Sequence, residues 1–340
     1  MFKSIALLTP IILFASLGHA APTPNTEMKK VLTELDKKNP LPIEKLTALE
    51  ARKQPTPTDA VKALMIKEKK STKPEKVAKV EEKEISGGVA SIPARFYYPE
   101  GLKKPFATIV YYHGGGFVIA DNNVYDATPR ALANQTKSLV ISVEYRKAPE
   151  NKFPAAHEDA FAAYKWVVNH IQTYGGDPKK IAVAGESAGA NLAINTAIRA
   201  RDARIVLPAH ILAVYPLASS DMNSVSYQEN ADAKPLNKPM MGWFVEQYLN
   251  KGSEAQDPRI NLVNANLAGL PSTTIITAEI DPLKMDGENL ASKMKAAGVD
   301  VEYKTYNGVT HEFFGMAPVL KEARDAQAFA SQELKASLQQ

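Results

Sequence analysis

Cysteine is absent from the 340 residues of this chain, so disulfides are excluded and stability has to come from a packed core. Long apolar runs are also scarce. Beyond the N-terminal stretch none reaches the roughly 20 residues that a membrane-spanning helix needs. Positive charge is in small excess, at a net +4, and the lysines of residues 62–83 alternate with glutamates. That alternation is typical of a solvated face or linker and does not indicate a nucleic-acid partner.

Cofactor motifs are missing as well. The glycine triplet Gly114-Gly115-Gly116 has no Walker lysine beside it and lacks the spacing of a dinucleotide-binding loop. Histidines and carboxylates do not recur at the spacings of metal ligands. We therefore expect a protein that works without a metal ion and without an organic cofactor.

The first 20 residues have the pattern of a signal peptide that is removed after export. Lys3 supplies a positive charge, and residues 5–17 are almost entirely apolar but too few to span a bilayer. Gly18-His19-Ala20 places small residues three positions and one position before a cut after Ala20. An uncleaved anchor is the alternative. We expect a periplasmic or secreted protein with no stable membrane span after processing.

The main part of the chain, residues 79–340, alternates between β-rich and helical patterns. The strand-like runs lie at 79–85, 92–98, 108–112, 139–143, 181–184, 209–215, 273–278 and 301–306. The helical patterns lie at 125–136, 157–172, 188–201, 283–297 and 318–338. The first two runs read as a hairpin with Gly87-Gly88 as its turn, and the alternation after them is typical of parallel sheets. We predict an α/β fold with a mixed, mostly parallel eight-stranded sheet and helices on both faces.

Two segments stand outside this alternation. Residues 21–78 hold short helical patterns that prolines separate and that are too short to bury a core of their own, so they should pack onto the sheet domain. These patterns lie at 27–38, 43–52 and 58–69. Residues 219–270 interrupt the alternation of strand-like and helical runs, and they contain a further helical pattern at 240–249. We place this interval as an insertion above the carboxyl edge of the sheet.

The pentapeptide Gly185-Glu186-Ser187-Ala188-Gly189 lies where a strand-like run meets a helical pattern. Glycines two residues to either side of a serine at such a join are typical of a nucleophile elbow, a tight turn that exposes the serine Oγ. The N-terminal N–H groups of the following helix then point toward that oxygen. The alternative is an ordinary turn in which Ser187 caps the helix.

A serine hydroxyl becomes a good nucleophile only with a general base beside it, and the base needs an acid that orients it. After a serine at a nucleophile elbow, the acid comes next in the chain and the base last. The base then follows the last strand, because ligands bind at the carboxyl ends of parallel strands. His311 lies just past the last strand-like run, whereas His113 precedes the serine. The other histidines fall in the leader, in a helical pattern or at the start of a strand. His311 is the predicted base, with a surface loop histidine as the alternative.

Three carboxylates follow the strand-like run at 273–278, namely Glu279, Asp281 and Asp286. Glu279 is too near the end of the strand, and Asp286 falls within the next helical pattern. Asp281 lies in the loop between them, so it is the predicted acid. Its alternative role is to cap the helix that follows.

The attacked carbonyl needs N–H donors that already point at the oxyanion it becomes. His113-Gly114-Gly115-Gly116-Phe117 directly follows the strand-like run at 108–112. Its three glycines let the backbone turn N–H groups into the site without interference from a Cβ. The N–H of Ala188, the residue after the serine, is a further expected donor.

Together these motifs resemble the hormone-sensitive-lipase-like family of α/β-hydrolase carboxylesterases, of the bacterial acetyl esterase and lipase type. The similarity runs from about residue 25 to residue 335. The matching segments are His113 to Phe117, Val143 to Glu150, Phe153 to Ala156, Glu158-Asp159, Gly175 to Pro178, the serine pentapeptide, Asp281 to Leu283 and His311. The resemblance implies an α/β-hydrolase fold in which Ser187 is the nucleophile, His311 the base and Asp281 its orienting acid.

The same resemblance implies an oxyanion hole formed by the N–H groups of Gly115, Gly116 and Ala188. It also implies a helical cap over the site, built from the N-terminal helices and residues 219–270. A homodimer that pairs through the last strand is expected at the level of the family alone.

Two residues depart from the family pattern. Glu186 precedes the nucleophile where the family usually has Asp, and Glu312 follows the base where the family usually has Gly. A carboxylate beside the base either raises the pKa of His311 or restricts the acyl pocket.

The predicted function is that of an exported serine carboxylesterase, which hydrolyses short-chain, acetyl-type esters of small molecules through an acyl-enzyme. Amide or peptide hydrolysis by the same triad and a non-catalytic binding module on this fold are the alternatives. The candidate walls of the substrate pocket, for each of which ordinary core packing is the alternative, are Phe117, Met240, Met241, Trp243, Phe244 and Phe314.

Overall fold

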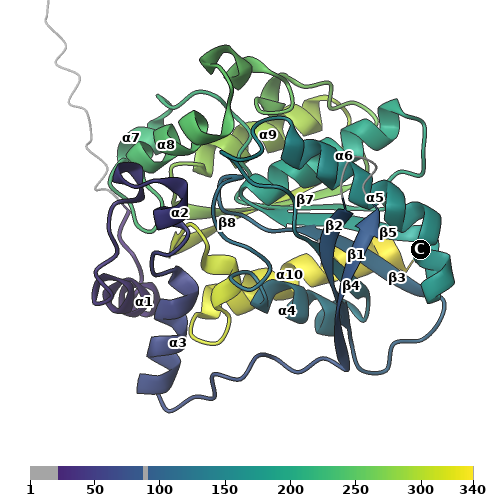
Figure 1. Ribbon diagram of the computed structural model, residues 1–340, viewed down its shortest axis with the longest axis horizontal. Helices are drawn as coiled ribbons and strands as arrows, with labels where there is room; N and C mark the ends of the chain where they lie inside the picture. Colours follow the sequence, from purple (N-terminus) through teal and green to yellow (C-terminus); the bar gives the residue numbers. More distant parts are fainter. Residues whose placement is uncertain (1–21, 87–90, 340) are drawn as a thin grey trace, which may run out of the picture.

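An eight-stranded mixed sheet organises the computed structural model, which describes residues 22–86 and 91–339 (Figure 1). Its strands are β1 (Lys79–Ser86), β2 (Ser91–Tyr98), β3 (Phe106–Tyr112), β4 (Leu139–Val143), β5 (Gly176–Glu186), β6 (Ile211–Val214), β7 (Thr273–Ile280) and β8 (Val301–Thr310). They lie in the order β1-β2-β4-β3-β5-β6-β7-β8; the pairs β1–β2 and β2–β4 are antiparallel and the rest are parallel. The predicted fold class is confirmed. The predicted Gly87-Gly88 turn lies outside the described residues.

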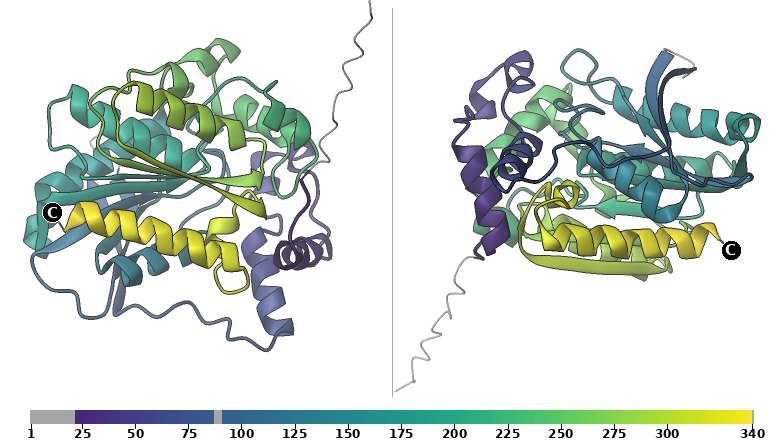
Figure 2. Two further views of the ribbon diagram at one scale, coloured as in Figure 1. Left: turned by 180° about the vertical axis from the view of Figure 1, so that it is seen from behind. Right: turned by 90° about the horizontal axis from the view of Figure 1, so that it is seen from below.

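Helices cover both faces of the sheet (Figure 1, Figure 2). On one face lie α4 (Ala127–Thr136) and α10 (Lys321–Leu338), and on the other lie α5 (Ala155–Tyr174), α6 (Ala188–Asp202) and α9 (Lys284–Ala296). Strands covered on both sides carry apolar side chains on both sides, and all five residues of β4 are buried. Across residues 22–86 and 91–339, no helix combines the length and the apolar composition that crossing a membrane requires.

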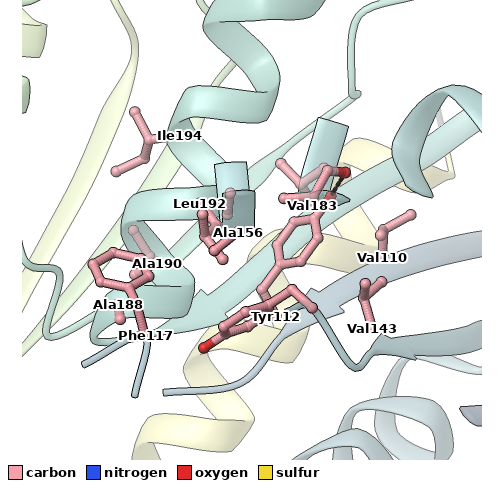
Figure 3. Packing of buried hydrophobic residues seen from close by; sticks show 14 of the residues in the cluster. Val110, Tyr112, Phe117, Val143, Ala156, Val183, Ala188, Ala190, Leu192 and Ile194 are labelled. Atoms are coloured by element: carbon pink, nitrogen blue, oxygen red, sulfur yellow. Dashed lines mark hydrogen bonds between the residues drawn. The ribbon is translucent and has the colours of Figure 1, made fainter. Parts of the chain in front are cut away.

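The start of α6 approaches the sheet closely because this helix carries small residues there (Figure 3). One hydrophobic cluster contains Ala188, Ala190, Leu192 and Ile194 of α6 together with Val110 and Tyr112 of β3 and Val183 of β5. A Cβ on Gly189 would lie 2.0 Å from the carbonyl oxygen of Tyr112, so only glycine fits at that point of contact. This packing fixes the first turn of α6 above the carboxyl ends of the central strands.

Short helical elements precede the sheet. They are α1 (Thr26–Asp36), η1 (Ile43–Lys45), α2 (Ala48–Ala51) and α3 (Pro57–Lys67). The side chains of Asn25, Thr47 and Thr56 cap the three α-helices. The helix predicted at 43–52 is interrupted, because the backbone of Leu46 is extended between η1 and α2 (φ −113°, ψ 156°).

The interval at 219–270 folds into a second group of short helices. They are α7 (Val225–Glu229), α8 (Lys238–Tyr248), η2 (Gly252–Gln256) and η3 (Leu262–Asn264). α8 lies beside the N-terminal helices, where Nε1 of Trp243 donates to the Leu46 carbonyl at 3.1 Å (Figure 1). Two segments far apart in the sequence therefore adjoin, and α8 also contributes to the cavity in front of Ser187.

The last strand is longer than predicted. The pattern indicates an end at Tyr306, but β8 continues to Thr310, and a short helix η4 (Phe313–Met316) follows. Gly308 lies in that extension with a left-handed φ of +68°. Its N–H donates to the side-chain carboxylate of Glu279 at 2.7 Å. At this point a side chain of β7 therefore takes the place of a backbone hydrogen-bond partner. As a result His311 is the first residue after the strand.

Candidate active site

Ser187 stands between β5 and α6 in a backbone conformation that residues other than glycine rarely adopt (φ 56°, ψ −119°). Its N–H donates to the Val214 carbonyl of the neighbouring strand at 2.9 Å, which holds the turn. Glycine is required at Gly185, since a Cβ there would lie 2.2 Å from the carbonyl oxygen of Gly189. Ser187 occupies the N-cap position of α6, yet its side chain makes no capping hydrogen bond. The alternative of a helix-capping serine is therefore excluded.

His311 and Asp281 form a buried pair at the ends of two adjacent parallel strands, β8 and β7. Nδ1 of His311 lies 2.6 Å from Oδ2 of Asp281, and the two side chains are 4% and 0% exposed. The second oxygen, Oδ1, accepts a hydrogen bond from the Leu283 N–H at 2.8 Å, which fixes the turn before α9. The contact with His311 is the one expected of an orienting acid, whereas α9 itself has Leu283 at its N-cap position and no side-chain cap. A proton on Nδ1 leaves Nε2 of His311 as the basic nitrogen.

The pKa of His311 stands above its usual value. Burial lowers this pKa, but the charge of Asp281 and the hydrogen bond to it raise it, and the charges of Glu312 and Glu186 raise it further. The raising effects prevail because the imidazolium form has a carboxylate partner in direct contact. The proton that such a histidine takes from a nucleophile is therefore well stabilised.

The three residues expected to form the oxyanion hole share a cavity with Ser187. Gly115, Gly116 and Ala188 line the same cavity as Ser187, and in the described part of the chain their N–H groups donate to no backbone carbonyl. Gly115 and Gly116 have left-handed φ values of +103° and +59°. A Cβ on Gly115 would lie 2.2 Å from the Ile119 carbonyl oxygen, so glycine is required there. Free N–H groups at this position suit a developing oxyanion.

His113 holds the loop that carries these donors. Its Nδ1 lies 2.7 Å from the Gly114 carbonyl oxygen, and its ring stacks on Tyr145 with centroids 4.3 Å apart. The Tyr145 hydroxyl donates to the His113 carbonyl at 2.8 Å. Burial lowers the pKa of His113, which favours the neutral ring. This histidine supports the loop and lies outside the catalytic cavity.

The cavity in front of Ser187 has a volume of about 60 Å³ and mostly apolar walls. Of the candidate wall residues, those that line it are Phe117, Met240, Met241 and Phe244. Trp243 and Phe314 do not line it, and the expectation for these two is corrected. Trp243 is buried against Leu46 of the N-terminal segment, and Phe314 is buried in the hydrophobic cluster on the α10 face of the sheet.

Other wall residues were not singled out by any motif. They include Ile119, Leu217, Leu236, Tyr248 and Ile260, which come from separate loops and helices. Tyr248 stacks on Phe117 with ring centroids 4.1 Å apart. Of these residues, the sequence could have predicted only Tyr248 as part of the cavity wall. Met240, Phe244 and Tyr248 recur at a spacing of four on α8 and so share one helix face.

Two tyrosines bind the buried carboxylate of Glu186, the residue before the nucleophile. The carboxylate accepts hydrogen bonds from the Tyr111 hydroxyl at 2.5 Å and from the Tyr215 hydroxyl. Burial raises the pKa of Glu186, while the hydrogen bonds from the two tyrosines oppose that rise. The ring of Tyr215 packs against His311 with centroids 4.5 Å apart. Glu186, which replaces the usual Asp of the family, therefore contacts Tyr215, and Tyr215 in turn contacts the predicted base, His311.

Glu312 adopts a left-handed φ of +67°, which explains why glycine suits this position in the family. The residue lines the catalytic cavity as well as two neighbouring cavities. Burial raises the pKa of Glu312 to about 7, and the adjacent His311 opposes that rise. Both effects expected from this carboxylate stay open: its charge is one of those that raise the pKa of His311, and the residue also lines the cavity in which an acyl group would lie.

No group of three or more His, Cys, Asp or Glu side chains within residues 22–86 and 91–339 is arranged to hold a metal ion. The polar groups at the cavity include the Ser187 hydroxyl, the imidazole of His311 with its Asp281 partner, the carboxylate of Glu312 and backbone N–H donors.

A family model for the alpha/beta hydrolase fold matches residues 109–315, which is more than half of the chain. The chain belongs to the alpha/beta-hydrolase family. Among relatives of this hydrolase, carboxylesterase NlhH of Mycobacterium tuberculosis is 36% identical over 266 residues, or 76% of this chain and 83% of NlhH. An acetyl esterase of Salmonella paratyphi A is 31% identical over 240 residues, or 69% of this chain and 73% of that protein.

A solved structure agrees with these relatives. The hyperthermophilic esterase of the archaeon Pyrobaculum calidifontis superposes with a TM-score of 0.85 at 35% identity, covering 92% of this hydrolase and 98% of that chain. The resemblance to hormone-sensitive-lipase-like carboxylesterases is confirmed, and the hydrolase is an enzyme that acts on carboxylic esters.

Proposed function

We propose that this hydrolase is an exported serine carboxylesterase that cleaves short-chain, acetyl-type esters through an acyl-enzyme on Ser187. The proposal rests on one observation. A strained serine, a buried His311–Asp281 pair and three backbone N–H groups that donate to no carbonyl of the described residues converge on one small apolar cavity. These are the parts that acyl transfer to a serine requires.

Acylation begins when Oγ of Ser187 attacks the carbonyl carbon of the ester while Nε2 of His311 takes the hydroxyl proton. The carbonyl π electrons move onto the oxygen, and the N–H groups of the oxyanion hole stabilise that charge. Asp281 stabilises the imidazolium and keeps its ring oriented. The oxyanion then collapses, the bond to the alcohol oxygen breaks, and His311 gives its proton to the departing alcohol.

Deacylation repeats the sequence with water. His311 takes a proton from water as the water oxygen bonds to the acyl carbon, and the oxyanion hole stabilises the second intermediate. When the bond to Oγ breaks, His311 returns the proton to Ser187. The carboxylic acid leaves and the free enzyme is restored.

The size of the cavity supports a preference for short acyl groups. At about 60 Å³, it has room for only a few water-sized groups, since one such group needs roughly 10–15 Å³ measured in this way. Phe117, Met241 and Phe244 restrict it further. The acetyl esterase of Salmonella paratyphi A, by its name, acts on esters of this kind.

Export is supported by the N-terminal sequence. Lys3, the apolar run at residues 5–17 and the small residues before Ala21 form the pattern of a cleaved leader. A cut after Ala20 would leave Asn25, which caps α1 and whose N–H donates to the Gly308 carbonyl at 2.8 Å. Expression of the full chain in a Gram-negative host, followed by fractionation and sequencing of the mature N-terminus, tests this. A cytoplasmic enzyme that retains residues 1–20 contradicts it.

The esterase assignment is tested with Ser187→Ala. We expect this variant to fold as the wild type does and to lose hydrolysis of p-nitrophenyl acetate. A fluorophosphonate probe should label the wild type at Ser187 and leave the variant unlabelled. Turnover by the folded variant would refute the proposed nucleophile.

A further inference from the structure

A second cavity, of about 170 Å³, adjoins the catalytic cavity and shares Glu312 with it. We call it the side cavity. Solvent-exposed residues line one part of it, namely Lys62, Thr72, Lys73, Pro74 and Glu75. Buried residues line another part, among them Tyr125, Thr128 and Glu186. The side cavity therefore runs from solvent to the two residues that neighbour the nucleophile and the base in sequence, Glu186 and Glu312.

One buried hydroxyl in the side cavity has no protein partner. The hydroxyl of Tyr125, a residue that is 7% exposed, makes no hydrogen bond within the described residues. The hydroxyl of Thr128, which is 1% exposed, lies beside the carboxylate of Glu186 and helps to lower the pKa of that carboxylate. The Tyr125 hydroxyl reaches the oxyanion loop, because a Cβ on Gly114 would lie 2.3 Å from it. Buried polar groups without a protein partner are normally satisfied by ordered water.

The carboxylate of Glu312 stands at the boundary between the two cavities. Among residues 22–86 and 91–339, no side chain forms an ion pair with it. It directly follows the catalytic base, His311. A water molecule that binds Glu312 from the side cavity is therefore next to the group that must deprotonate it.

The two cavities differ in the character of their walls. The catalytic cavity is lined mainly by apolar side chains such as Met241 and Phe244, and its small volume is taken up by the acyl group of an acyl-enzyme. The side cavity has room for several waters, since one water needs roughly 10–15 Å³ of such volume, and its buried part offers hydroxyls and carboxylates. The side cavity therefore offers water a route to the acyl-enzyme along buried polar groups; a third cavity, of about 570 Å³, also shares Glu312 with the catalytic cavity.

We propose that the side cavity is a water-binding site that supplies the hydrolytic water to His311, and that Glu312 positions that water at the boundary. The inference rests on the acyl-enzyme of the proposed function. In the step concerned, the water oxygen bonds to the acyl carbon, and the bond from that carbon to Oγ of Ser187 breaks. His311 carries one water proton to Oγ, and the acid product keeps the other. Glu312 does not bond to the substrate and acts through the water it holds.

The test is a competition between two nucleophiles for the same acyl-enzyme. The enzyme is given p-nitrophenyl acetate with a fixed concentration of 1-butanol at pH 8, and butyl acetate and acetic acid are quantified. Butanol is apolar along most of its length, so it reaches the acyl group through the catalytic cavity. Both nucleophiles use His311, so a change in the strength of the base cancels from the product ratio. The ratio is also independent of how much of a variant is folded.

Variants that remove polar groups from the side cavity should disfavour water. Tyr125→Phe, Thr128→Val and Glu312→Leu are each expected to raise the ratio of butyl acetate to acetic acid about threefold to tenfold, the loss that one hydrogen bond to a neutral group commonly carries. Glu312→Gln, which keeps a hydrogen-bonding side chain of the same size, should stay near the wild-type ratio. In pre-steady-state assays of the three disruptive variants, the rate constant of acylation should change less than that of deacylation.

Matched controls come from buried hydroxyls outside the side cavity. Tyr306 and Ser331 also have hydroxyl groups with no hydrogen-bond partner within the described residues, and neither lines the side cavity. Tyr306→Phe and Ser331→Ala should leave the product ratio unchanged. Equal ratios for Glu312→Leu and Glu312→Gln, or wild-type ratios for Tyr125→Phe and Thr128→Val, overturn the inference. If the wild type forms no butyl acetate and shows no burst of p-nitrophenol, the acyl-enzyme itself is refuted, which is a separate outcome.

Discussion

The carboxylate of Asp281 makes a 2.6 Å hydrogen bond with Nδ1 of His311, and neither side chain is more than 4% exposed. The pair comes from the ends of two parallel strands that are paired along their length, β7 and β8. The sheet itself therefore sets the distance between acid and base, and the position of His311 does not depend on a flexible loop.

Replacing Asp281 with asparagine should leave the fold intact and remove most of the activity. In Asp281→Asn the turn before α9 keeps its hydrogen bond, because the amide oxygen of the variant can still accept from the Leu283 N–H. The amide cannot hold the proton on Nδ1 of His311 or stabilise the imidazolium, so kcat should fall by about 10³–10⁴-fold. Steady-state kinetics with p-nitrophenyl acetate measure this, and thermal denaturation serves as the control. A loss below about tenfold would contradict the role of Asp281.

The pH dependence of kcat/KM should show the raised pKa of His311. The base acts in its neutral form, so activity is present above this pKa and is lost as pH falls through it. Asp281 and, to a smaller degree, Glu312 and Glu186 raise the pKa against the effect of burial. The acid limb of the profile should therefore lie above the usual value for histidine, about 6.5.

Glu312→Gln should move that acid limb to lower pH, because the substitution removes one of the negative charges that favour the imidazolium. The activity at alkaline pH should change little by comparison. A matched variant, Glu302→Gln, removes an exposed carboxylate from β8 and should leave the limb where it is. An acid limb that stays in place in Glu312→Gln would show that this carboxylate does not act on the base.

The buried carboxyl of Asp286 should make the protein less stable as pH rises. Burial raises the pKa of Asp286 to about 8, although the N–H groups of Ala218 and Ser219 oppose that rise. The unfolded chain releases this proton near pH 4, and the folded chain keeps it until about pH 8. The contribution of this carboxyl to stability is thus complete below pH 4 and is lost as pH rises through about 8.

Asp286→Asn removes this titration and keeps an oxygen that can accept from the same N–H groups. Urea denaturation between pH 5 and pH 8 should show the wild type losing stability relative to the variant, with a limiting slope of about 1.4 kcal/mol per pH unit. Other buried carboxyls, such as Glu186, are present in both proteins and cancel from the comparison. Parallel slopes for the two proteins would mean that Asp286 is already ionised in the fold throughout pH 5 to pH 8, and that burial does not raise its pKa.

Chain order and local chemistry were sufficient to predict which residues lie together at the candidate active site. A nucleophile elbow needs small residues at fixed positions, and Gly185 and Gly189 are the positions where a Cβ would meet backbone oxygen. Asp281 and His311 followed from the rule that ligands bind beyond the carboxyl ends of parallel strands. These features are local in sequence or depend only on the order of elements, so the pattern of residues specifies them.

Features that depend on how separate segments meet could not be predicted in the same way. The helical pattern at 240–249 shows that Trp243 and Phe244 are buried, but not that Phe244 faces the cavity while Trp243 contacts Leu46. The apolar pattern ends β8 too early, because Gly308 and its partners lie beyond the strand's apolar run. The position of Glu312 at the boundary of two cavities depends on elements far apart in the sequence.

Two glycine-to-alanine substitutions should change stability in opposite directions. In Gly189→Ala the new Cβ would lie 2.0 Å from the Tyr112 carbonyl oxygen, so α6 must move away from β3. We expect a loss of at least about 1–3 kcal/mol, the usual cost of overpacking. In Gly242→Ala, within α8, the new Cβ meets no atom within 4 Å. That substitution should stabilise the protein by roughly 0.5–1 kcal/mol.

Denaturant unfolding of both variants gives the two free energies, and esterase activity gives a second readout. Because Gly189 lies two residues after the nucleophile, Gly189→Ala should also reduce kcat, whereas Gly242→Ala should not. Equal stability of the two variants would show that the close approach of α6 to β3 is not maintained in solution.

Enlarging the catalytic cavity should extend the range of acyl groups that the enzyme accepts. Met241 lines this cavity and is 5% exposed, so Met241→Ala adds room where the acyl chain lies. The quantity to measure is kcat/KM for p-nitrophenyl hexanoate divided by kcat/KM for p-nitrophenyl acetate. This ratio does not depend on the concentration of folded enzyme, which matters because truncating a buried methionine costs about 2–5 kcal/mol of stability.

We expect the ratio to rise by roughly tenfold or more, since each methylene that gains an apolar site is worth about 1–3 kcal/mol in specificity. Phe314→Leu is the matched control, because Phe314 is fully buried but lies outside the cavity, in the hydrophobic cluster on the α10 face of the sheet. It should lower stability without changing the ratio. If Met241→Ala leaves the ratio unchanged while Phe314→Leu raises it, the acyl chain lies elsewhere, and the volume of the cavity does not set the preference for short esters.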